Sequence, residues 1–403
     1  MTSRTADEIA FDLMATSEGR IDPYPLYEEL RAIGPVRSAE LPVWYFTNFE
    51  DTRTILRDNH WIKSDGPGSI VAGEELPEFE EERGDRPMLF LNPPDHTRLR
   101  GLVSRAFTPR RVQGLHERIE TMVDELLDDL EAKGDVNMID EFAYLLPVRV
   151  ISEMIGVPLE DRDYFRPLTA ALVATLEPVF TPEQGAEAQR ASIKFRAYFD
   201  DLIQVRREDP QDDLLSGLIE ASDGSDALSH DEIISTVILI YAAGFETTTN
   251  LIGNGIYNLL RYPDQLAKVR ADLDLVPNLV EEVLRFDSPV QLDGRMASED
   301  IEIAGVTVPK GETAITLLGA ANRDPSMLDN PEVFDVTRTD IQVMSFASGI
   351  HFCLGASLAR MEGRIAFDRL LRRFSSIEAS GEAEWKANLT LRGLQSLPVR
   401  VAV

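Results

Sequence analysis

The chain of 403 residues has a single cysteine, Cys353. One thiol excludes an intramolecular disulfide framework, so a reducing, cytoplasmic location is the simpler expectation. It also excludes a self-contained iron–sulfur cluster, which takes about four cysteine ligands. Three roles remain for Cys353: a buried inert side chain, a catalytic nucleophile, or a thiolate ligand to a metal.

Long apolar runs and excess basic charge are also lacking. The most apolar segment, residues 233–244, has 12 residues, whereas a helix that spans a bilayer needs about 20, so we expect a buried helix and no membrane anchor. The N-terminal residues lack the basic and apolar regions of a signal peptide. The net charge of -30 argues against a nucleic-acid partner, and the acidic stretch 74–85 is interpreted as a solvated loop.

Glycine motifs for nucleotides are absent, since neither G-x-G-x-x-G after a strand nor a P-loop occurs. Helical periodicity, in contrast, runs through most of the chain. Helices are predicted at 108–134 and 229–262, and further ones near 23–33, 49–58, 140–155, 183–207, 263–273, 277–286 and 354–373. Strand signals occur at 43–47, 301–311 and 397–403. The sequence therefore predicts a mainly α fold with a small β region, formed by residues 1–403 as a single domain.

Cys353 lies in the stretch FASGIHFCLG, directly before a predicted amphipathic helix. The partial positive charge of a helix N-terminus favours a thiolate there. Gly349 and Gly355 lack side chains, which would let the backbone approach a large flat group. A catalytic thiol would need a positioned histidine base, and His351 is close to Cys353 in the sequence. A thiolate ligand to haem iron suits these features, with Phe346 as a packing partner.

This stretch resembles the haem-ligand signature of the cytochrome P-450 family, F-x-x-G-x-H-x-C-x-G, through Phe346, Gly349, His351, Cys353 and Gly355. The resemblance covers essentially the whole chain. The chain is also similar, more loosely, to soluble bacterial enzymes that hydroxylate polyketide macrolides. It implies the P-450 fold, a triangular helical prism. It also implies heme b (iron protoporphyrin IX) between the long central helix and the helix after Cys353, with Cys353 as the metal ligand.

Residues 243–250, AGFETTTN, lie within the predicted long helix. Ala243 and Gly244 have little bulk, so a flat ligand would fit against the helix backbone. Glu246 and Thr247 add a carboxylate and a hydroxyl after that gap. Taken alone, the segment is more typical of a helix–helix contact with a polar end. However, it is similar to the family's oxygen-activation motif, which implies that Glu246 and Thr247 are the catalytic proton-delivery pair and that Ala243 lies against the haem.

A second pair of side chains, His96 and Arg100, is spaced i, i+4 on a predicted helix after NPPD. A solvated basic turn is the alternative interpretation. The resemblance implies that these two residues bind the haem propionates together with Arg295 and His351. Buried carboxylates need charged donors of this kind.

The segment EEVLR, residues 281–285, is similar to the E-x-x-R fold signature of the family through Glu282 and Arg285. Such a pair contributes little when exposed, but buried it demands a specific geometry. An arginine from a later segment usually completes this group. Because Val333 stands at the position expected for it, Arg338 or Arg323 is the substitute we expect.

The implied reaction is monooxygenation, in which one atom of O2 enters a C–H bond of a hydrophobic polyketide, terpenoid or steroid-like molecule. Electrons are expected from a separate ferredoxin and ferredoxin reductase, because the chain has no flavin motif. The predicted docking surface is basic and comprises Arg105, Arg110, Arg111, Arg360, Arg364, Arg372 and Arg373. A monomer is expected.

The substrate is expected to contact the 66–91 loop and a set of mainly apolar residues, namely Leu239, Ala243, Thr247, Val290, Leu292 and Leu394. Two alternatives stay open. One is a haem-thiolate enzyme driven by peroxide, and the other is a non-catalytic haem-thiolate sensor. The presence of both Glu246 and Thr247 counts against each of them.

Overall fold

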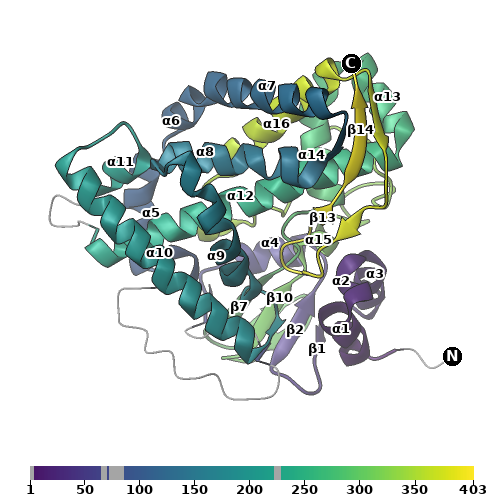
Figure 1. Cartoon of the computed structure of the whole chain (residues 1–403). Coiled ribbons are helices and arrows are strands. Elements are labelled where there is room, and N and C mark those ends of the chain that lie inside the picture. The colour runs from purple at the N-terminus through teal and green to yellow at the C-terminus, as the bar shows by residue number, and fades with distance from the viewer. Residues whose placement is uncertain (1–3, 65–69, 72–85, 222–227) are drawn as a thin grey trace. The chain divides into compact units, whose positions relative to one another are not determined.

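The computed structural model describes residues 4–64, 70–71, 86–221 and 228–403 (Figure 1). Two compact units divide the chain. The first joins Met1–Ser64, Glu120–Tyr144 and Thr247–Val403, and the second joins Asp65–Ile119 and Leu145–Glu246. Helices α7 (His116–Lys133) and α12 (His230–Arg261) contribute residues to both units.

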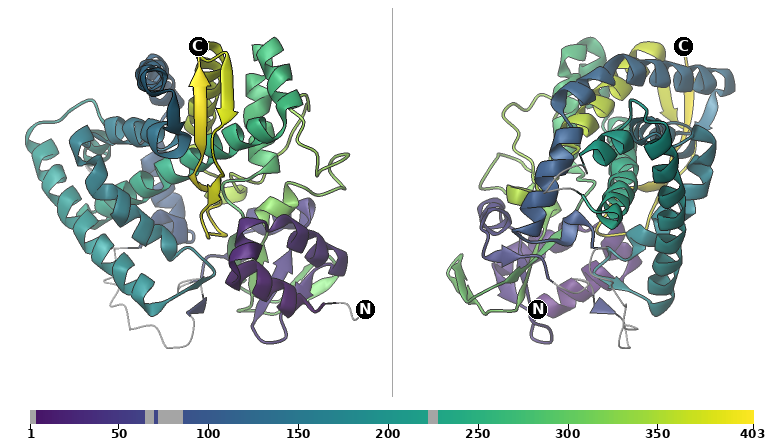
Figure 2. Two further views of the ribbon diagram at one scale, coloured as in Figure 1. Left: turned by 45° about the vertical axis from the view of Figure 1, so that its right-hand side comes forward. Right: turned by 90° about the vertical axis from the view of Figure 1, so that its left-hand side faces the viewer.

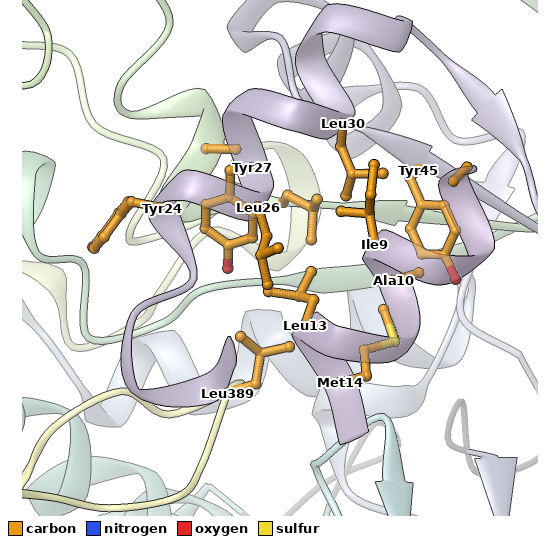
Figure 3. Packing of buried hydrophobic residues seen from close by; sticks show 13 residues of the cluster. Ile9, Ala10, Leu13, Met14, Tyr24, Leu26, Tyr27, Leu30, Tyr45 and Leu389 are labelled. Atoms are coloured by element: carbon orange, nitrogen blue, oxygen red, sulfur yellow. The ribbon is translucent and has the colours of Figure 1, made fainter. Parts of the chain in front are cut away.

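Three helices begin the first unit: α1 (Ala6–Ala15), α2 (Ser17–Ile21) and α3 (Tyr24–Ile33). A capping box fixes the start of α1, since the Thr5 side chain accepts from the Glu8 backbone and the Glu8 carboxylate accepts from Thr5. The apolar faces of α1 and α3 form one buried cluster, to which Tyr45 and Leu389 contribute from distant parts of the chain (Figure 3). This cluster holds the N-terminal helices against the strands that follow.

A five-stranded sheet has the order β1-β2-β10-β7-β3 (Figure 1). Its strands are β1 (Val36–Arg37), β2 (Val43–Phe46), β3 (Trp61–Ile62), β7 (Asp293–Ala297) and β10 (Thr313–Thr316). Strands β10 and β2 are parallel, and the other neighbours are antiparallel. The register of β3 with β7 aligns Ile62 with Met296, so Lys63, one residue on, stands opposite Arg295.

Smaller sheets complete the strands of this unit. Strands β11 (Ser376–Ala379), β14 (Pro398–Ala402) and β5 (Asp135–Asn137) form one, shown in yellow and blue in Figure 2. Strand β8 (Ile301–Ile303) pairs with β9 (Val306–Val308), and β12 (Glu384–Trp385) pairs with β13 (Leu394–Ser396).

The other helices of the first unit are α4 (Phe49–Arg57), α13 (Pro263–Ala271), α14 (Val276–Phe286), α15 (Leu318–Ala321) and α16 (Ala356–Arg373). Short 3-10 segments lie at Leu273–Leu275 and Gly349–His351, and a π-helix at Ile139–Ala143. Helix α16 runs beside α7 (Figure 1), where Arg369 pairs with Glu120 and Arg373 with Asp128, at 2.7 and 2.5 Å.

The second unit is nearly all helical. Its helices are α5 (Asp95–Ala106), α6 (Pro109–Gly114), α8 (Leu145–Ile155), α9 (Arg162–Ala174), α10 (Pro182–Glu208) and α11 (Leu214–Glu220), with 3-10 turns at Met88–Phe90 and Leu159–Asp161. Strands β4 (Ile70–Val71) and β6 (Val179–Phe180) pair in parallel. Packed rings at its centre come from α9, α10 and α12; Phe165 stacks on Phe195 at 5.0 Å and contacts Tyr241 at 4.7 Å.

The mainly α prediction is confirmed, and most helix ranges agree closely with those expected. The single helix predicted at 108–134 is wrong: Leu115 separates α6 from α7, after Gly114, a poor helix former. The helix expected at 140–155 likewise begins with a π-helical segment. Most of the 66–91 loop, including the acidic stretch 74–85, lies outside the described residues.

Candidate active site

The loop before α16 holds Cys353 by backbone contacts. The Cys353 N–H donates to the Phe346 carbonyl at 3.0 Å, and the Phe352 N–H donates to the Gly349 carbonyl at 3.1 Å. The chain thus turns back on itself between Phe346 and Cys353, and helix α16 begins three residues after the cysteine. The side chain of Cys353 is exposed. This geometry presents one thiol on a rigid turn at a helix N-terminus, which favours the thiolate.

Gly349 and Gly355 lack a side chain for different physical reasons. Gly349 has a φ of 72°, and a Cβ there would lie 2.2 Å from the Leu56 carbonyl oxygen of α4. Its small size therefore admits protein backbone at this position. The expected contact of Gly349 with the haem stays a prediction. At Gly355 a Cβ would meet no described atom within 4 Å. The space beside Gly355 is open, as a large flat group next to Cys353 requires.

A buried charge cluster lies on β7 and at the end of β3. Arg295 Nη1 donates to Asp293 Oδ1 at 2.7 Å, and Lys63 Nζ donates to the same oxygen at 2.5 Å. Burial alone would raise the pKa of the Asp293 carboxyl, but Arg295 and Lys63 hold that pKa well below its usual range. Burial lowers the pKa of the Lys63 ammonium, which Asp293 only partly opposes. The sequence analysis singled out Arg295, as a propionate ligand, and did not identify Lys63 as part of this cluster.

Arg295 gives the test of whether an anionic cofactor fits. Its side chain is 2% exposed, and its Nη2 has no hydrogen-bond partner among the residues that the structure describes. A buried guanidinium N–H without an acceptor is costly, and a carboxylate is its natural partner. A haem propionate fits this requirement.

The other predicted propionate ligands are found in both units. His96 and Arg100 lie on α5 in the second unit, one turn apart; His96 is 2% exposed and Arg100 is half-buried. His351 lies in the first unit, in the 3-10 turn beside Cys353, and is half-buried. All three remain assigned to the propionates as a proposal.

The predicted catalytic pair lies within the unbroken helix α12. Glu246 and Thr247 are consecutive and half-buried, and Ala243 is exposed. The small size of Gly244 is explained by a neighbouring helix, because a Cβ there would lie 2.8 Å from the Ile151 side chain of α8. The helix–helix interpretation of the segment therefore holds for Gly244.

The predicted substrate residues differ in exposure. Leu239, Val290 and Leu292 are half-buried, whereas Leu394 is 1% exposed. Leu292 packs against the N-terminal cluster that contains Leu389, and Val290 bridges to Leu391. Leu394 pairs with Trp385 between β13 and β12.

Glu282 and Arg285 on α14 are joined by a third charged residue. Arg285 donates to both oxygens of Glu282 at 2.7 and 2.8 Å, and both side chains are at most 1% exposed. Arg338 Nε lies 3.4 Å from Glu282 Oε1, so Arg338 completes the group. Arg323 does not: its guanidinium carbon lies between the rings of Tyr24 and Phe286, 3.4 and 3.8 Å from their centroids.

Among the described residues, no group of three or more His, Cys, Asp or Glu side chains forms a metal cluster. Within the same residues, no helix has the length and apolar character required to cross a bilayer.

The comparisons with known proteins identify the family of the chain. A model of the family described as cytochrome P-450 matches residues 67–401. The chain belongs to the cytochrome P-450 family. It is 41% identical to the biotin biosynthesis cytochrome P-450 of Bacillus subtilis (strain 168), over 96% of this chain and 98% of that one. It is 39% identical to the 6-deoxyerythronolide B hydroxylase of Saccharopolyspora erythraea, over 94% and 96%.

Among solved structures, the chain is similar to P450BioI in complex with hexadec-9Z-enoic acid ligated acyl carrier protein. The TM-score is 0.89 at 40% identity, over 96% of this chain and 99% of that one. The P-450 fold is thereby established, and the chain is a haem-dependent P-450 monooxygenase with heme b as its cofactor.

Proposed function

We propose that this P-450 hydroxylates a hydrophobic polyketide, terpenoid or steroid-like molecule with electrons from a ferredoxin and its reductase. The observation that carries the proposal is the Glu246–Thr247 pair, half-buried on an unbroken helix. Such an acid–hydroxyl pair can deliver protons during O2 activation, whereas a gas sensor would have no need of it. The relative that hydroxylates 6-deoxyerythronolide B supports a macrolide-like substrate.

The residues of the chain have separate tasks in this mechanism. Haem ligated by a thiolate supplies the oxygen chemistry, because the sulfur favours O–O cleavage. Cys353 would be that ligand, held in place by the Phe346 carbonyl. Arg295, His351, His96 and Arg100 would bind the propionates. Thr247 would hold a water by its hydroxyl, and Glu246 would pass a proton to that water from solvent.

The substrate contacts we propose are Leu239, Ala243, Val290, Leu292 and Leu394. These residues are apolar and bind a hydrophobic molecule by excluding water. The P-450 solved with an acyl carrier protein raises a second candidate, an acyl chain presented on a carrier. A carrier-bound substrate would also involve a protein surface, so the two candidates differ in whether the free small molecule binds.

The proposed electron donor follows from what the chain lacks, since one cysteine and no flavin motif leave it without a redox cofactor beyond haem. We also propose that the protein works as a monomer in the cytoplasm, as a single haem-thiolate domain formed by both units. The single thiol supports a reducing compartment.

The test combines binding and turnover. The purified holoenzyme is titrated with macrolactones, steroids, terpenoids, free fatty acids and acyl carrier protein loaded with the same acids, and the shift of the haem spin state is recorded. Compounds that bind are incubated with NADH, a heterologous ferredoxin and its reductase, and the product is identified by mass spectrometry. Binding of loaded carrier protein alone would replace the first candidate by the second. Turnover with peroxide but not with ferredoxin would overturn the proposed donor.

A further inference from the structure

Three asparagines line one face of the C-terminal half of α12, within the first unit. Asn250, Asn254 and Asn258 follow one another at intervals of four residues, and each side chain is at most 1% exposed. Residues four apart lie one above the other on a helix. Asparagine is a poor helix former, and its amide is costly to bury without hydrogen bonds. Three such amides on one buried face therefore require partners.

The protein binds the amide nitrogens of two of these asparagines. Asn254 Nδ2 donates to the backbone carbonyls of Asp287 and Arg392, at 3.1 and 3.2 Å. Asn258 Nδ2 donates to the Asn254 carbonyl at 2.8 Å and to Asp287 Oδ2 at 3.2 Å. Carbonyl and carboxylate oxygens only accept, so these contacts fix which end of each amide is the nitrogen. The Oδ1 atoms of Asn254 and Asn258 have no partner among the described residues.

The amide of Asn250 has fewer contacts still. Neither its Oδ1 nor its Nδ2 has a hydrogen-bond partner in the part of the chain that the structure describes. The amide packs against the backbone of Gly393, where a Cβ would lie 1.9 Å from Asn250 Oδ1. Any larger residue at 393 would displace the amide, so Gly393 makes room for it. Buried polar groups without a protein partner are usually satisfied by internal water.

The asparagine face continues the side of α12 on which Thr247 lies. Thr247 precedes Asn250 by three residues, and residues three or four apart are neighbours on a helix surface. Successive asparagines are about 6 Å apart along the helix axis. One water can bridge two of them, because each of its hydrogen bonds spans about 2.8 Å. Water sites along this face would therefore reach the hydroxyl of Thr247.

We propose that the asparagine face of α12 binds internal water, and that Asn250 is a positioning residue that holds the water next to Thr247. The inference rests on the proposed role of Thr247 in proton delivery. Asn250 acts through the water, because its amide offers one donating and one accepting atom and so fixes both the place and the orientation of the water. An apolar side chain at 250 would leave the water at Thr247 less well held.

A high-resolution crystal structure of the holoenzyme is the first test. It should show ordered water within about 3 Å of Oδ1 of all three asparagines and of Asn250 Nδ2. Asn250→Leu removes both polar atoms at similar volume. If water satisfies the amide, the leucine deprives that water of its partners and the melting temperature falls. If the amide is buried dry, the leucine removes an unsatisfied polar group and the melting temperature rises, which overturns the inference.

Turnover tests the link to Thr247. Asn250→Leu should lower product per NADH severalfold and raise hydrogen peroxide accordingly, while substrate affinity from spin-state titration stays near that of the wild type. Asn250→Ser keeps a donor and an acceptor and leaves space for a second water, so it should restore most of the coupling. A serine variant as uncoupled as the leucine variant would contradict an effect through water.

Thr249→Val is the matched control. Thr249 is 2% exposed, its Oγ1 has no hydrogen-bond partner among the described residues, and it points about 100° away from Asn250 around the same helix. The valine variant should keep wild-type coupling. Equal uncoupling by Thr249→Val and Asn250→Leu would assign the effect to the packing of α12 and overturn the inference.

Thr247→Ala separates the inference from the proposed function. If Thr247→Ala uncouples turnover and Asn250→Leu does not, proton delivery by Thr247 stands and the role of Asn250 is wrong. If neither variant uncouples turnover, the proposed role of Thr247 itself fails, and the inference with it. Uncoupling by both, together with ordered water on the Asn250 amide, supports both.

Discussion

Arg360 lies over the ring of Phe346, with its guanidinium carbon 4.4 Å from the ring centroid. The same guanidinium donates to both oxygens of Glu281 on α14, at 2.6 and 2.9 Å. Arg360, which lies on α16, therefore contacts both α14 and the loop before α16 that contains Cys353. Phe346 in turn supplies the carbonyl that accepts from the Cys353 backbone N–H. Arg360 thus contacts the residue whose carbonyl accepts from the cysteine backbone.

Arg360→Met should lower the free energy of unfolding by about 1–2 kcal/mol, since it removes a cation–π contact and a half-buried ion pair. It should also increase the fraction of reduced protein that loses the thiolate signature in its carbon monoxide spectrum. Urea denaturation and that spectrum are the measurements. Arg372→Met, which removes an exposed pair to Asp368 on the same helix, serves as the control and should cost only some tenths of a kcal/mol.

The proposed donor surface needs exposed arginines, and Arg364 meets this requirement better than Arg360. Its side chain is 46% exposed and its nearest carboxylate, that of Glu281, is 3.9 Å away. Arg364→Glu should slow reduction by ferredoxin severalfold at low salt, with a smaller effect at high salt because exposed charges are screened. Stopped-flow reduction is the measurement, and spin-state titration should show unchanged substrate affinity.

Arg53→Glu on α4 is the matched control for this reversal, because Arg53 is similarly exposed, at 39%, and lies outside the proposed docking set. Equal rates for wild type and Arg364→Glu, or equal slowing by both variants, would remove Arg364 from the donor surface.

Glu282→Gln should be strongly destabilising. Glu282 accepts two hydrogen bonds from Arg285 and one from the Asp335 backbone at 2.8 Å, and it is completely buried. Loss of its charge leaves the Arg285 guanidinium buried without a counter-ion, which costs about 3–5 kcal/mol. Denaturation of the holoenzyme measures the cost. The neighbouring Glu281→Gln should cost far less, because Glu281 is 20% exposed; equal losses would contradict a special role for the buried group.

The sequence predicted the residues that act through local spacing. Most helix ranges follow from short patterns of capping, periodicity and turn residues. Cys353 with its glycines and the helical pair Glu282 and Arg285 follow from their resemblance to short motifs of the P-450 family. Strands β7 and β10 were missed because their four or five residues have no clear alternation, and their pairing joins segments that are distant in the chain. Such pairing is a tertiary property.

For the same reason Lys63 could not be found from the sequence. It is one lysine in a short extended stretch, and its meaning comes from the register that places it opposite Arg295. Arg338 and Arg323 show a related limit: both were candidates for one place, and only the path of the chain after Pro331 decides between them. Gly244 was ambiguous between a ligand and a neighbouring helix, and Ile151 supplies the answer.

Thr247→Ala should separate electron use from product formation. Without the hydroxyl, a water that receives protons from Glu246 is held less well, so more of the reduced oxygen should leave as hydrogen peroxide. We expect NADH consumption to continue while product per NADH falls about a hundredfold, the lower end of the usual range for loss of a proton-transfer group. Product and peroxide are quantified in the same reaction. Thr247→Ser keeps a hydroxyl and should restore coupling; failure of the serine variant to do so would point to packing instead.

Glu362 on α16 gives the stability of the protein a pH dependence. Its side chain is 2% exposed, and Oε2 has no hydrogen-bond partner among the described residues. Burial raises the pKa of this carboxyl well above its usual value of 4.5. As the pH rises above that value, the unfolded chain loses the proton while the folded protein keeps it. The stability that this group contributes is therefore complete below pH 4.5 and is lost as the pH rises toward the folded pKa.

Glu362→Gln removes this dependence, because the amide does not titrate. Relative to wild type, the variant should gain stability with increasing pH, by about 1.4 kcal/mol for each pH unit between the unfolded and folded pKa values. Urea denaturation of both proteins at several pH values from about 5 to 8 measures the difference. Subtraction removes the contribution of every other titrating group that the two proteins share. A difference that stays constant across the series would show that Glu362 is ionised in the folded protein, held by a partner or by water.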